Sequence, residues 1–496
     1  MLFVALTIVY LLWSWSPVLG GLGGDNANYL LMARYYSPYS ATSGVAEYFA
    51  IQSIYPPLFP LLLGIAGGGE SLLTAHLITT LFLLGSFAVF YWWLLNEHIA
   101  PIVAFFVLLS FASLPGIYLQ TLSIHSENLY ILFSLWVLAC ASSIQPSDRK
   151  SRYRMIIAVV ALACAYLTRG AGLSLSVAWL FWLWINRNHN RYLYSLLAVI
   201  PILLWSRFGG TGSTDYWEQL VHGYQNPVYF FNQIGVQAGY LFAGWIANFG
   251  TSRASFLAGC VLLFLGLSAA VWRTVSGKMD GFYVWVYIAM ITLWPFPAEA
   301  QRLVLVLIPV LLWQIAWACS RLKVKLPNTG LMFTGVLTIL LVSSLPEVAL
   351  TFQRYHHSLP PTVPADYKHT DGWYAPDIRI ASYWVQSMAA VETDLSQLNG
   401  SVPPEACIFA IKPSVVALLA DRVSKAPPKI EQQNFDQAIQ AGGCNYFYLL
   451  SFTSPTYPSP LYPYQRLQGR LEIIRTSGIE RMDGQKQMLA ALARIQ

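Results

Sequence analysis

One carboxylate stands apart near the start of the chain. Asp25 is the only acidic residue among the first 46, and it lies five residues past an apolar stretch, in the run LGGLGGDNANYLLMARYY. A carboxylate held just outside a lipid layer can act as a general base, which removes a proton from an attacking hydroxyl or amine. Asp is also a favoured N-cap, so a purely structural role at the start of a helix remains open.

Three further ionisable residues lie at the ends of apolar runs. Glu127 is in SIHSENLY, Arg169 in YLTRGAG and Arg302 in PFPAEAQRLVLVLIP. Charged side chains at a membrane boundary are energetically expensive and therefore mark candidate functional sites. Together with Asp25 they predict a polar cavity that opens on one side of the membrane. Glu127 could instead simply complement a helix dipole, and Arg302 could reach the lipid surface or pair with Glu299.

The remaining site candidates carry weaker signals. Tyr55 begins YPPLFPLLLG, where two prolines fix a turn, and it either supports that turn or contacts a substrate. His125 lies beside Glu127, although a lone histidine is more often a structural residue. The segment 207–252 is long, polar and aromatic, and long loops in compact proteins are often functional lids. The sequence has no CxxC pair and no His-rich spacing typical of a metal site.

Composition places the chain in a membrane. It is 56% hydrophobic and only 10% charged, with a mean hydropathy of +0.50, whereas soluble domains carry about 25% charged residues. The net charge of +6 does not indicate a nucleic-acid partner. Its basic residues collect in short loops between apolar runs, as the positive-inside rule expects.

The apolar runs predict an all-α bundle that crosses the lipid bilayer about eleven times. A span needs roughly 20 residues, and the stretch 57–69, with its prolines and glycines, is predicted to lie at the interface. The predicted spans are 2–20, 71–95, 100–119, 128–144, 155–168, 172–186, 192–206, 254–272, 282–296, 303–320 and 330–350.

Basic residues also predict the orientation. With a cytoplasmic N-terminus, the cytoplasmic loops hold eleven Lys and Arg residues and the opposite loops hold five, in agreement with the positive-inside rule. Residues 21–56 and the tail after 351 then lie outside the cytoplasm, on a multi-pass protein of the inner (plasma) membrane. The first run lacks a charged n-region and an A-x-A cleavage site, so it is predicted to be a retained span.

The tail predicts a small extracytoplasmic α/β domain at 351–496, beside a transmembrane domain at 1–350 whose first outer loop is 21–70. The runs ACIFAI and YFYLLS read as buried strands. Cys407 and Cys444 fall near the starts of these strands, and both a disulfide and two free thiols remain open. Helices are predicted at 376–397, 413–420, 432–441 and 483–495.

These motifs, taken in order, resemble a known superfamily. A first span followed by a loop Asp, then YPPLFPLLLG, SENL, LTRG and the spacing from Arg302 to Pro309 are similar to the GT-C polytopic membrane glycosyltransferases. The nearest branch is that of the protein O-mannosyltransferases and aminoarabinose transferases. The resemblance covers about residues 1–350, while the tail matches only loosely, in PPEACIFAIKPSVVALLADR.

The resemblance implies a reaction and assigns roles. The reaction transfers a sugar from a polyprenyl-phosphate donor to a protein, lipid or glycan acceptor on the non-cytoplasmic side, with Asp25 as base and inversion at the anomeric carbon. Guanidinium groups bind phosphate through paired hydrogen bonds, which makes Arg302 the first phosphate ligand, ahead of Arg169 and Arg207. Relatives often carry a second acidic residue after the loop Asp, but this chain has Asn26. This departure favours a reaction with no cofactor, although a divalent cation held with Glu127 is not excluded.

Three other functions remain open from sequence. A transporter or flippase of lipid-linked saccharides would be expected to show inverted repeats and midplane charges, and no internal repeat is evident here. An O-antigen polymerase or ligase would be expected to carry a large late outer loop with arginines. A membrane-anchored binding protein would need far fewer spans than eleven.

Overall fold

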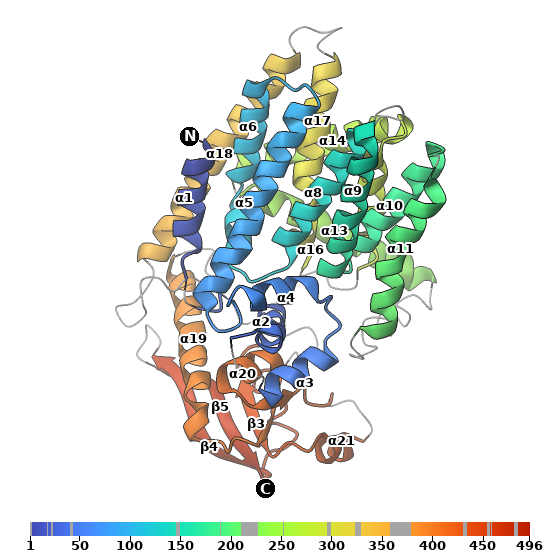
Figure 1. Ribbon diagram of the computed structural model, residues 1–496. Coiled ribbons are helices and arrows are strands. Elements are labelled where there is room, and N and C mark those ends of the chain that lie inside the picture. The colour runs from blue at the N-terminus through green and yellow to red at the C-terminus, as the bar shows by residue number, and fades with distance from the viewer. Residues whose placement is uncertain are drawn as a thin grey trace.

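The chain is largely helical, with one small sheet near its C-terminus (Figure 1). The helical bundle forms one end of the molecule and the sheet the other, with three short helices from the first predicted loop between them. The computed structural model describes residues 2–16, 18–20, 23–39, 43–144, 149–188, 190–209, 227–250, 252–294, 299–322, 329–357, 378–429, 434–453, 457, 459–480 and 485–496.

Four helical segments of the described chain are long and apolar enough to cross a membrane. A fifth span is formed if α6 (Pro101–Ala112) and α7 (Pro115–Thr121), bent by 59° at the intervening break, are taken together. The bend has a local cause, because Pro115 opens α7 and Leu114 before it is extended. The four long segments are α5 (Leu72–Asn96), Ser151–Thr168 of α9 (Arg149–Thr168), α14 (Arg253–Val275) and Ala300–Leu322. The last of these covers α16 (Ala300–Leu305) and α17 (Leu307–Leu322).

A helix lies at every predicted span position, but the number of eleven crossings is not confirmed. Over the residues that the structure describes, the other helices at predicted span positions do not pass as complete spans by length and composition. They are α1 (Leu2–Ser14), α8 (Glu127–Ser142), α10 (Gly172–Ile185), α11 (Arg191–Phe208), α15 (Met279–Thr292) and α18 (Thr329–His357).

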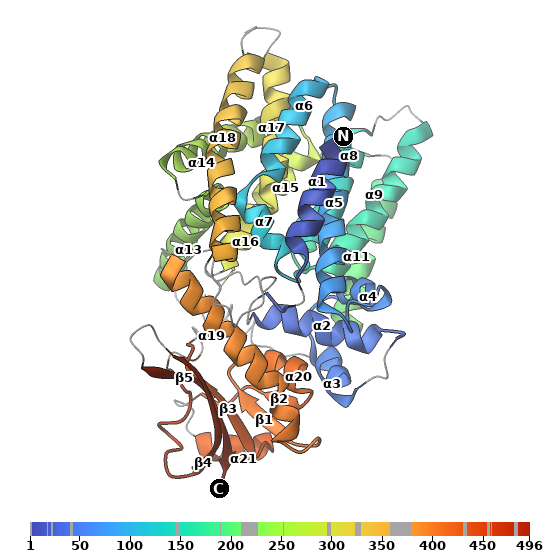
Figure 2. The same cartoon turned by 90° about the vertical axis from the view of Figure 1, so that its left-hand side faces the viewer.

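The prediction of an open lid loop at 207–252 is wrong for much of its length. Residues Pro227–Ala247 form helix α13, which packs against α14, α15 and α16 (Figure 2). Its apolar residues recur at helical spacing, but the loop prediction extended over them the polar, glycine-rich character of the run GGTGSTDYWEQLVHGYQNP. Residues 210–226 of the same prediction lie outside the described part of the chain.

The first predicted outer loop folds into α2 (Gly24–Tyr36), α3 (Gly44–Gln52) and α4 (Leu58–Ile65). Asp25 lies in the first turn of α2, and Gly23, not Asp25, occupies the N-cap position. The side chain of Asp25 is therefore free of the capping role that the sequence left open. The predicted interfacial stretch contains α4, which buries Phe59 and Leu63 against its surroundings.

The tail forms a five-stranded sheet of order β2-β1-β3-β5-β4. Strands β1, β2 and β3 are parallel, while β5 runs antiparallel to both β3 and β4. The predicted strands at 406–411 and 446–451 are confirmed. The elements are α19 (Ile378–Ser396), β1 (Cys407–Ala410), α20 (Pro413–Ala420), β2 (Val423–Lys425), α21 (Phe435–Gly442), β3 (Tyr446–Leu450), β4 (Leu471–Glu480) and β5 (Lys486–Ile495).

The helix predicted at 483–495 is wrong, because this segment is strand β5. Its sequence, KQMLAALARI, is rich in helix-forming Ala and Leu. Pairing with β3 on one side and β4 on the other, together with burial of Leu489–Ala493, outweighs that local preference.

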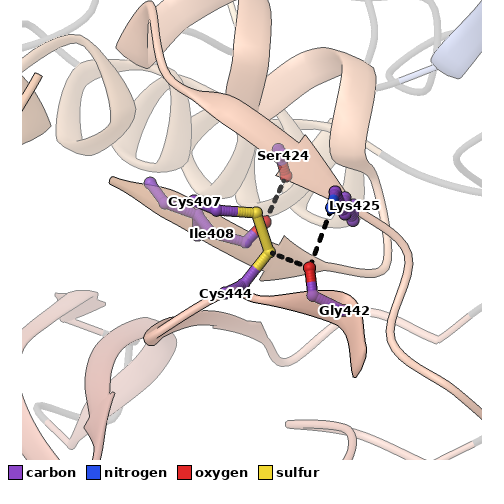
Figure 3. Close-up of a disulfide and its surroundings, with 6 residues drawn as sticks. All are labelled: Cys407, Ile408, Ser424, Lys425, Gly442 and Cys444. Carbon is purple, nitrogen blue, oxygen red and sulfur yellow. Dashed lines mark hydrogen bonds between the residues drawn. A yellow bond between two sulfur atoms is a disulfide. The ribbon is translucent and has the colours of Figure 1, made fainter. Parts of the chain in front are cut away.

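A disulfide joins Cys407, at the start of β1, to Cys444, just before β3 (Figure 3). The sequence left this pairing open, and the fold brings the two residues together because β1 and β3 are adjacent parallel strands. Nearby, the ammonium of Lys425 donates to the carbonyl of Gly442 at 2.8 Å. The disulfide links two residues 37 positions apart and so closes a loop that contains α20, β2 and α21.

Helices of the first loop pack directly on the tail. Arg34 of α2 donates to the carbonyl of Leu418 in α20 at 3.1 Å, and Ser414 donates back to the carbonyl of Gly24 at 3.1 Å. The two views agree that α2 and α20 lie side by side (Figures 1 and 2). One hydrophobic core includes residues of α2, α4, α20, β1 and β3, so the loop and the tail lie on the same end of the bundle, as predicted.

Gly20 fixes the exit from α1 toward α2. It has φ +80°, and a Cβ built there would lie 2.1 Å from the carbonyl oxygen of Leu122. We expect Gly20→Ala to lower the thermal unfolding temperature of the purified protein, because alanine is strained at positive φ and meets a backbone atom. Gly239→Ala is the control, since that site in α13 is open space and alanine favours the helix. Equal unfolding temperatures for the two variants would contradict this role of Gly20.

Candidate active site

Arg302 lies at the centre of a network of charged side chains. Its Nη2 donates to Oδ2 of Asp25 at 2.5 Å, and its Nε lies 3.3 Å from Oε1 of Glu127. The same Nε contacts the carboxylate of Glu299, three residues earlier, and Nη1 lies 3.4 Å from Nε2 of His125. Helix α16 buries its apolar side chains in the bundle and leaves this guanidinium among three carboxylates.

Both oxygens of Asp25 are held. Tyr55 donates its hydroxyl to Oδ1 at 2.5 Å, while Arg302 occupies Oδ2. Burial acts to raise the pKa of Asp25, but the charge of Arg302, the nearby His125 and the two hydrogen bonds outweigh it and hold the pKa well below the usual range. Asp25 is therefore a carboxylate at physiological pH. An ionised carboxylate has about four lone-pair positions, so Asp25 can still accept a further hydrogen bond.

Glu127 and Arg169 form a second ion pair behind Asp25. Glu127 is fully buried at the start of α8, and Nη1 of Arg169 lies 2.7 Å from its Oε1. Arg169 also donates to the hydroxyl of Ser126 at 3.4 Å, and Ser126 shares a hydrogen bond of 2.9 Å with Tyr29 of α2. A charge buried this deeply needs its partner. The pair therefore anchors the turn between α9 and α10 to the start of α8. Ser126 extends this connection to Tyr29, on the helix that carries Asp25.

His125 is a neutral imidazole in this setting. Burial and the positive charge of Arg302 lower the pKa of His125 to about 4, although Glu127 and Asp25 act in the opposite direction. Its Nε2 lies beside Arg302, and its buried Nδ1 has no hydrogen-bond partner in the described part of the chain. A neutral imidazole can either donate to or accept from a hydroxyl group, so His125 suits contact with an uncharged polar ligand.

A cavity of about 430 Å³ opens onto Asp25. Its walls come from the first-loop helices, from the bundle and from the junction between β1 and α20. The tail therefore supplies one wall of the cavity, and Figure 2 shows it packed against the first-loop helices. The lining residues are Gly23, Gly24, Asp25, Asn28, Phe49, Tyr55, His125, Glu299, Arg302, Ile411, Lys412, Pro413 and Ser414.

Sequence reasoning missed Lys412 and Ser414 as parts of this cavity. Lys412 immediately precedes α20, and Ser414 is the second residue of that helix. Lys412 adds a second positive charge, besides that of Arg302, to a lining that also holds Asp25 and Glu299. The only sequence signal is a lysine before a proline that opens a helix, which is a common surface pattern.

The structure gathers six of the seven predicted site residues and leaves one apart. Arg207 is exposed near the end of α11 and does not line the cavity. The six that meet are Asp25, Tyr55, His125, Glu127, Arg169 and Arg302. In the described ranges, no group of three or more His, Cys, Asp or Glu side chains is arranged to hold a metal ion.

The fold is that of a known class of membrane enzyme. No protein-family model matches the sequence, and no curated protein sequence matches it. Among solved structures, ArnT from Cupriavidus metallidurans in the apo state is 12% identical, with TM-score 0.55, over 99% of this chain and 97% of that chain. ArnT from the same organism bound to undecaprenyl phosphate is 13% identical, with TM-score 0.56, over the same shares of both chains.

ArnT is a GT-C glycosyltransferase, and the chain has the GT-C fold that its motifs predicted. At 12–13% identity the likeness establishes the fold. With the long apolar helices it identifies a multi-pass membrane protein.

Proposed function

We propose that the protein is a glycosyltransferase that moves a sugar from a polyprenyl-phosphate donor to an acceptor hydroxyl or amine, with inversion at the anomeric carbon. The observation that carries the proposal is the Asp25 carboxylate, held by Arg302 and Tyr55 at the wall of a polar cavity in a membrane bundle. The ArnT structure of the same fold, with undecaprenyl phosphate bound, supports a lipid-phosphate donor.

Asp25 is the base in this proposal. Tyr55 and Arg302 fix the carboxylate through one oxygen each, which leaves lone pairs for an acceptor hydroxyl or amine. The acceptor enters through the cavity, gives its proton to Asp25 and attacks the anomeric carbon from the face opposite the phosphate. Direct attack of this kind inverts the anomeric centre and needs no covalent intermediate.

Arg302 and Lys412 receive the phosphate leaving group. Both are cations on the cavity wall, and guanidinium presents paired donors to phosphate oxygens. A phosphate that engages Arg302 draws the guanidinium from Asp25 and so weakens the interaction that depresses the pKa of Asp25. Donor binding thus raises the basicity of Asp25 toward the range in which a general base is effective.

The cellular setting follows from the same features. A donor with its prenyl chain in the lipid and its sugar phosphate in the cavity requires a site at the membrane boundary. The Cys407–Cys444 disulfide supports a tail in an oxidising compartment, which agrees with a non-cytoplasmic site in the inner membrane. The acceptor is a protein, lipid or glycan of the cell envelope, and a divalent cation is not required.

A transfer assay tests the proposal directly. The full-length protein in lipid nanodiscs is given undecaprenyl phosphoryl sugars that carry labelled mannose, glucose or 4-amino-4-deoxyarabinose, with envelope extracts as acceptors. We expect at least one donor to release undecaprenyl phosphate and to place its label on an acceptor. Failure of every donor to react, together with no binding of undecaprenyl phosphate, would contradict the proposal.

A further inference from the structure

A second, smaller cavity adjoins the Asp25 cavity on the bundle side of Arg302. It measures about 190 Å³ and shares His125, Glu299 and Arg302 with the larger one. Its other walls come from α7 and the short connection after it, from the residue after α13 and from α16. These are Gly116, Leu119, Gln120, Ser123, Asn248, Gln301 and Leu305.

The chemistry of the two cavities differs. Away from the three shared residues, the larger cavity presents the charges of Asp25 and Lys412, whereas the smaller one presents only amide and hydroxyl groups among its polar side chains. Neutral amides and hydroxyls can both donate to and accept from the hydroxyl groups of a sugar. At about 30 Å³ for each water molecule in the liquid, the smaller cavity has room for several waters or for a single sugar ring.

Gln120 has an unmet hydrogen-bonding group at this cavity. The side chain is only 5% exposed, and its Nε2 has no hydrogen-bond partner among the described residues. A buried donor without an acceptor is destabilising, and such a group in a native site calls for an explanation. A ligand oxygen in the cavity that Gln120 lines would provide the acceptor. The Nδ1 of His125, on the shared wall, is also without a partner in the described chain.

The wall of the smaller cavity is held in place. Asn248 is buried and donates through Nδ2 to the carbonyls of Gly244 at 2.9 Å and Gln301 at 3.0 Å. Gly116 packs so closely that a Cβ on it would lie 1.9 Å from Oδ1 of Asn248. The walls formed by α7, α13 and α16 are therefore locked against one another, so the cavity is a formed site that can select a ligand by shape.

We infer that the smaller cavity binds the sugar ring of the donor, with Gln120 as a residue that determines sugar specificity. This inference rests on the proposed glycosyltransferase function. The phosphate then lies against Arg302 on the shared wall, and the anomeric carbon lies at the junction of the two cavities, with its face opposite the phosphate turned toward an acceptor in the larger cavity. The tail contributes residues only to the larger cavity, which leaves that side for the acceptor.

The inference is tested by comparing the binding of lipids with and without a sugar on the same undecaprenyl phosphate. Binding of undecaprenyl phosphate and of the undecaprenyl phosphoryl sugars named above is measured for the full-length wild type and for Gln120→Leu. We expect the variant to bind the preferred sugar lipid about 3- to 10-fold more weakly, the effect of one lost neutral hydrogen bond. We expect it to bind sugar-free undecaprenyl phosphate as the wild type does. The control is Gln237→Leu, which removes another buried glutamine in the bundle, one that lines neither cavity.

The outcomes separate the inference from the proposed function. Equal weakening of sugar-free and sugar-bearing lipid, or no weakening of either, would overturn the sugar site while leaving the transferase intact. A wild-type protein that binds neither lipid would remove the proposed function, and this inference with it. Thermal unfolding of Gln120→Leu at the wild-type temperature would show that its weaker binding of the sugar lipid does not arise from loss of the fold.

Discussion

Asp25→Asn is expected to reduce kcat for sugar transfer by about 10²–10⁴, the usual contribution of a general base. Asparagine has the shape of aspartate and can keep one of the hydrogen bonds that Tyr55 and Arg302 make, but it cannot take a proton. Arg302 retains Glu127 and Glu299 as partners in the variant. The variant should therefore insert, fold and bind the donor normally while failing in the chemical step.

The measurement is steady-state transfer by purified protein with the donor found active. Asp436→Asn is the matched control, because it also removes an aspartate paired with an arginine, Arg470 at 2.6 Å, but on the exposed surface of α21. An exposed pair of this kind contributes little, so the control should keep full activity. If Asp25→Asn stays within about threefold of the wild type, Asp25 supports the structure only and another group must be the base.

Arg302→Lys is expected to lower kcat/KM for the lipid-linked donor roughly 10–150-fold, which corresponds to one lost charge-assisted hydrogen bond of about 1.5–3 kcal/mol. The guanidinium of Arg302 reaches three carboxylates and His125 in this structure. A lysine ammonium is a point charge that cannot present the same planar pair of donors to phosphate. We expect the acceptor KM to change much less.

Donor and acceptor kinetics are measured separately for this variant, with Arg470→Lys as a surface control of the same substitution. Sugar-free undecaprenyl phosphate should also bind Arg302→Lys more weakly, since the phosphate is the part recognised. Wild-type kinetics toward the donor, or a change in the acceptor KM alone, would remove Arg302 from the phosphate site.

The sequence predicted the membrane bundle and most of the polar cluster for a simple physical reason. Apolar runs predict where the helices lie. When such helices are joined by short loops, every second loop lies at the same boundary of the membrane. Charged residues placed at those ends, such as Glu127, Arg169 and Arg302, therefore gather at one level of the bundle. Asp25 joins them because α2 lies across that end of the bundle (Figure 2).

Contacts between distant segments were not predictable in the same way. Lys412 and Ser414 reach the cavity because α20 packs on α2, nearly 400 residues away along the chain, as the 3.1 Å hydrogen bond from Ser414 to Gly24 shows. No local pattern encodes that packing. Gln120 was missed as well, because a glutamine in an apolar run becomes notable only once its amide is seen to lack a partner.

Two element predictions failed because tertiary contacts decided the outcome. Helix α13 begins at the end of the polar, glycine-rich run GGTGSTDYWEQLVHGYQNP, on which the loop prediction rested, and it packs against α14, α15 and α16. Strand β5 has the composition of a helix, yet it completes the sheet between β3 and β4. For β5, pairing on both edges overrides the local helix preference of its Ala and Leu residues.

The anomeric configuration of the product tests the proposed role of Asp25 most directly. NMR coupling constants of the transferred sugar, compared with those of the donor, show whether the anomeric centre changes in a single transfer. We predict inversion, because Asp25 deprotonates an acceptor that attacks the anomeric carbon directly and displaces the phosphate. Retention of configuration would contradict this, since it requires a second displacement through an enzyme-bound sugar, with a carboxylate as nucleophile in place of a base.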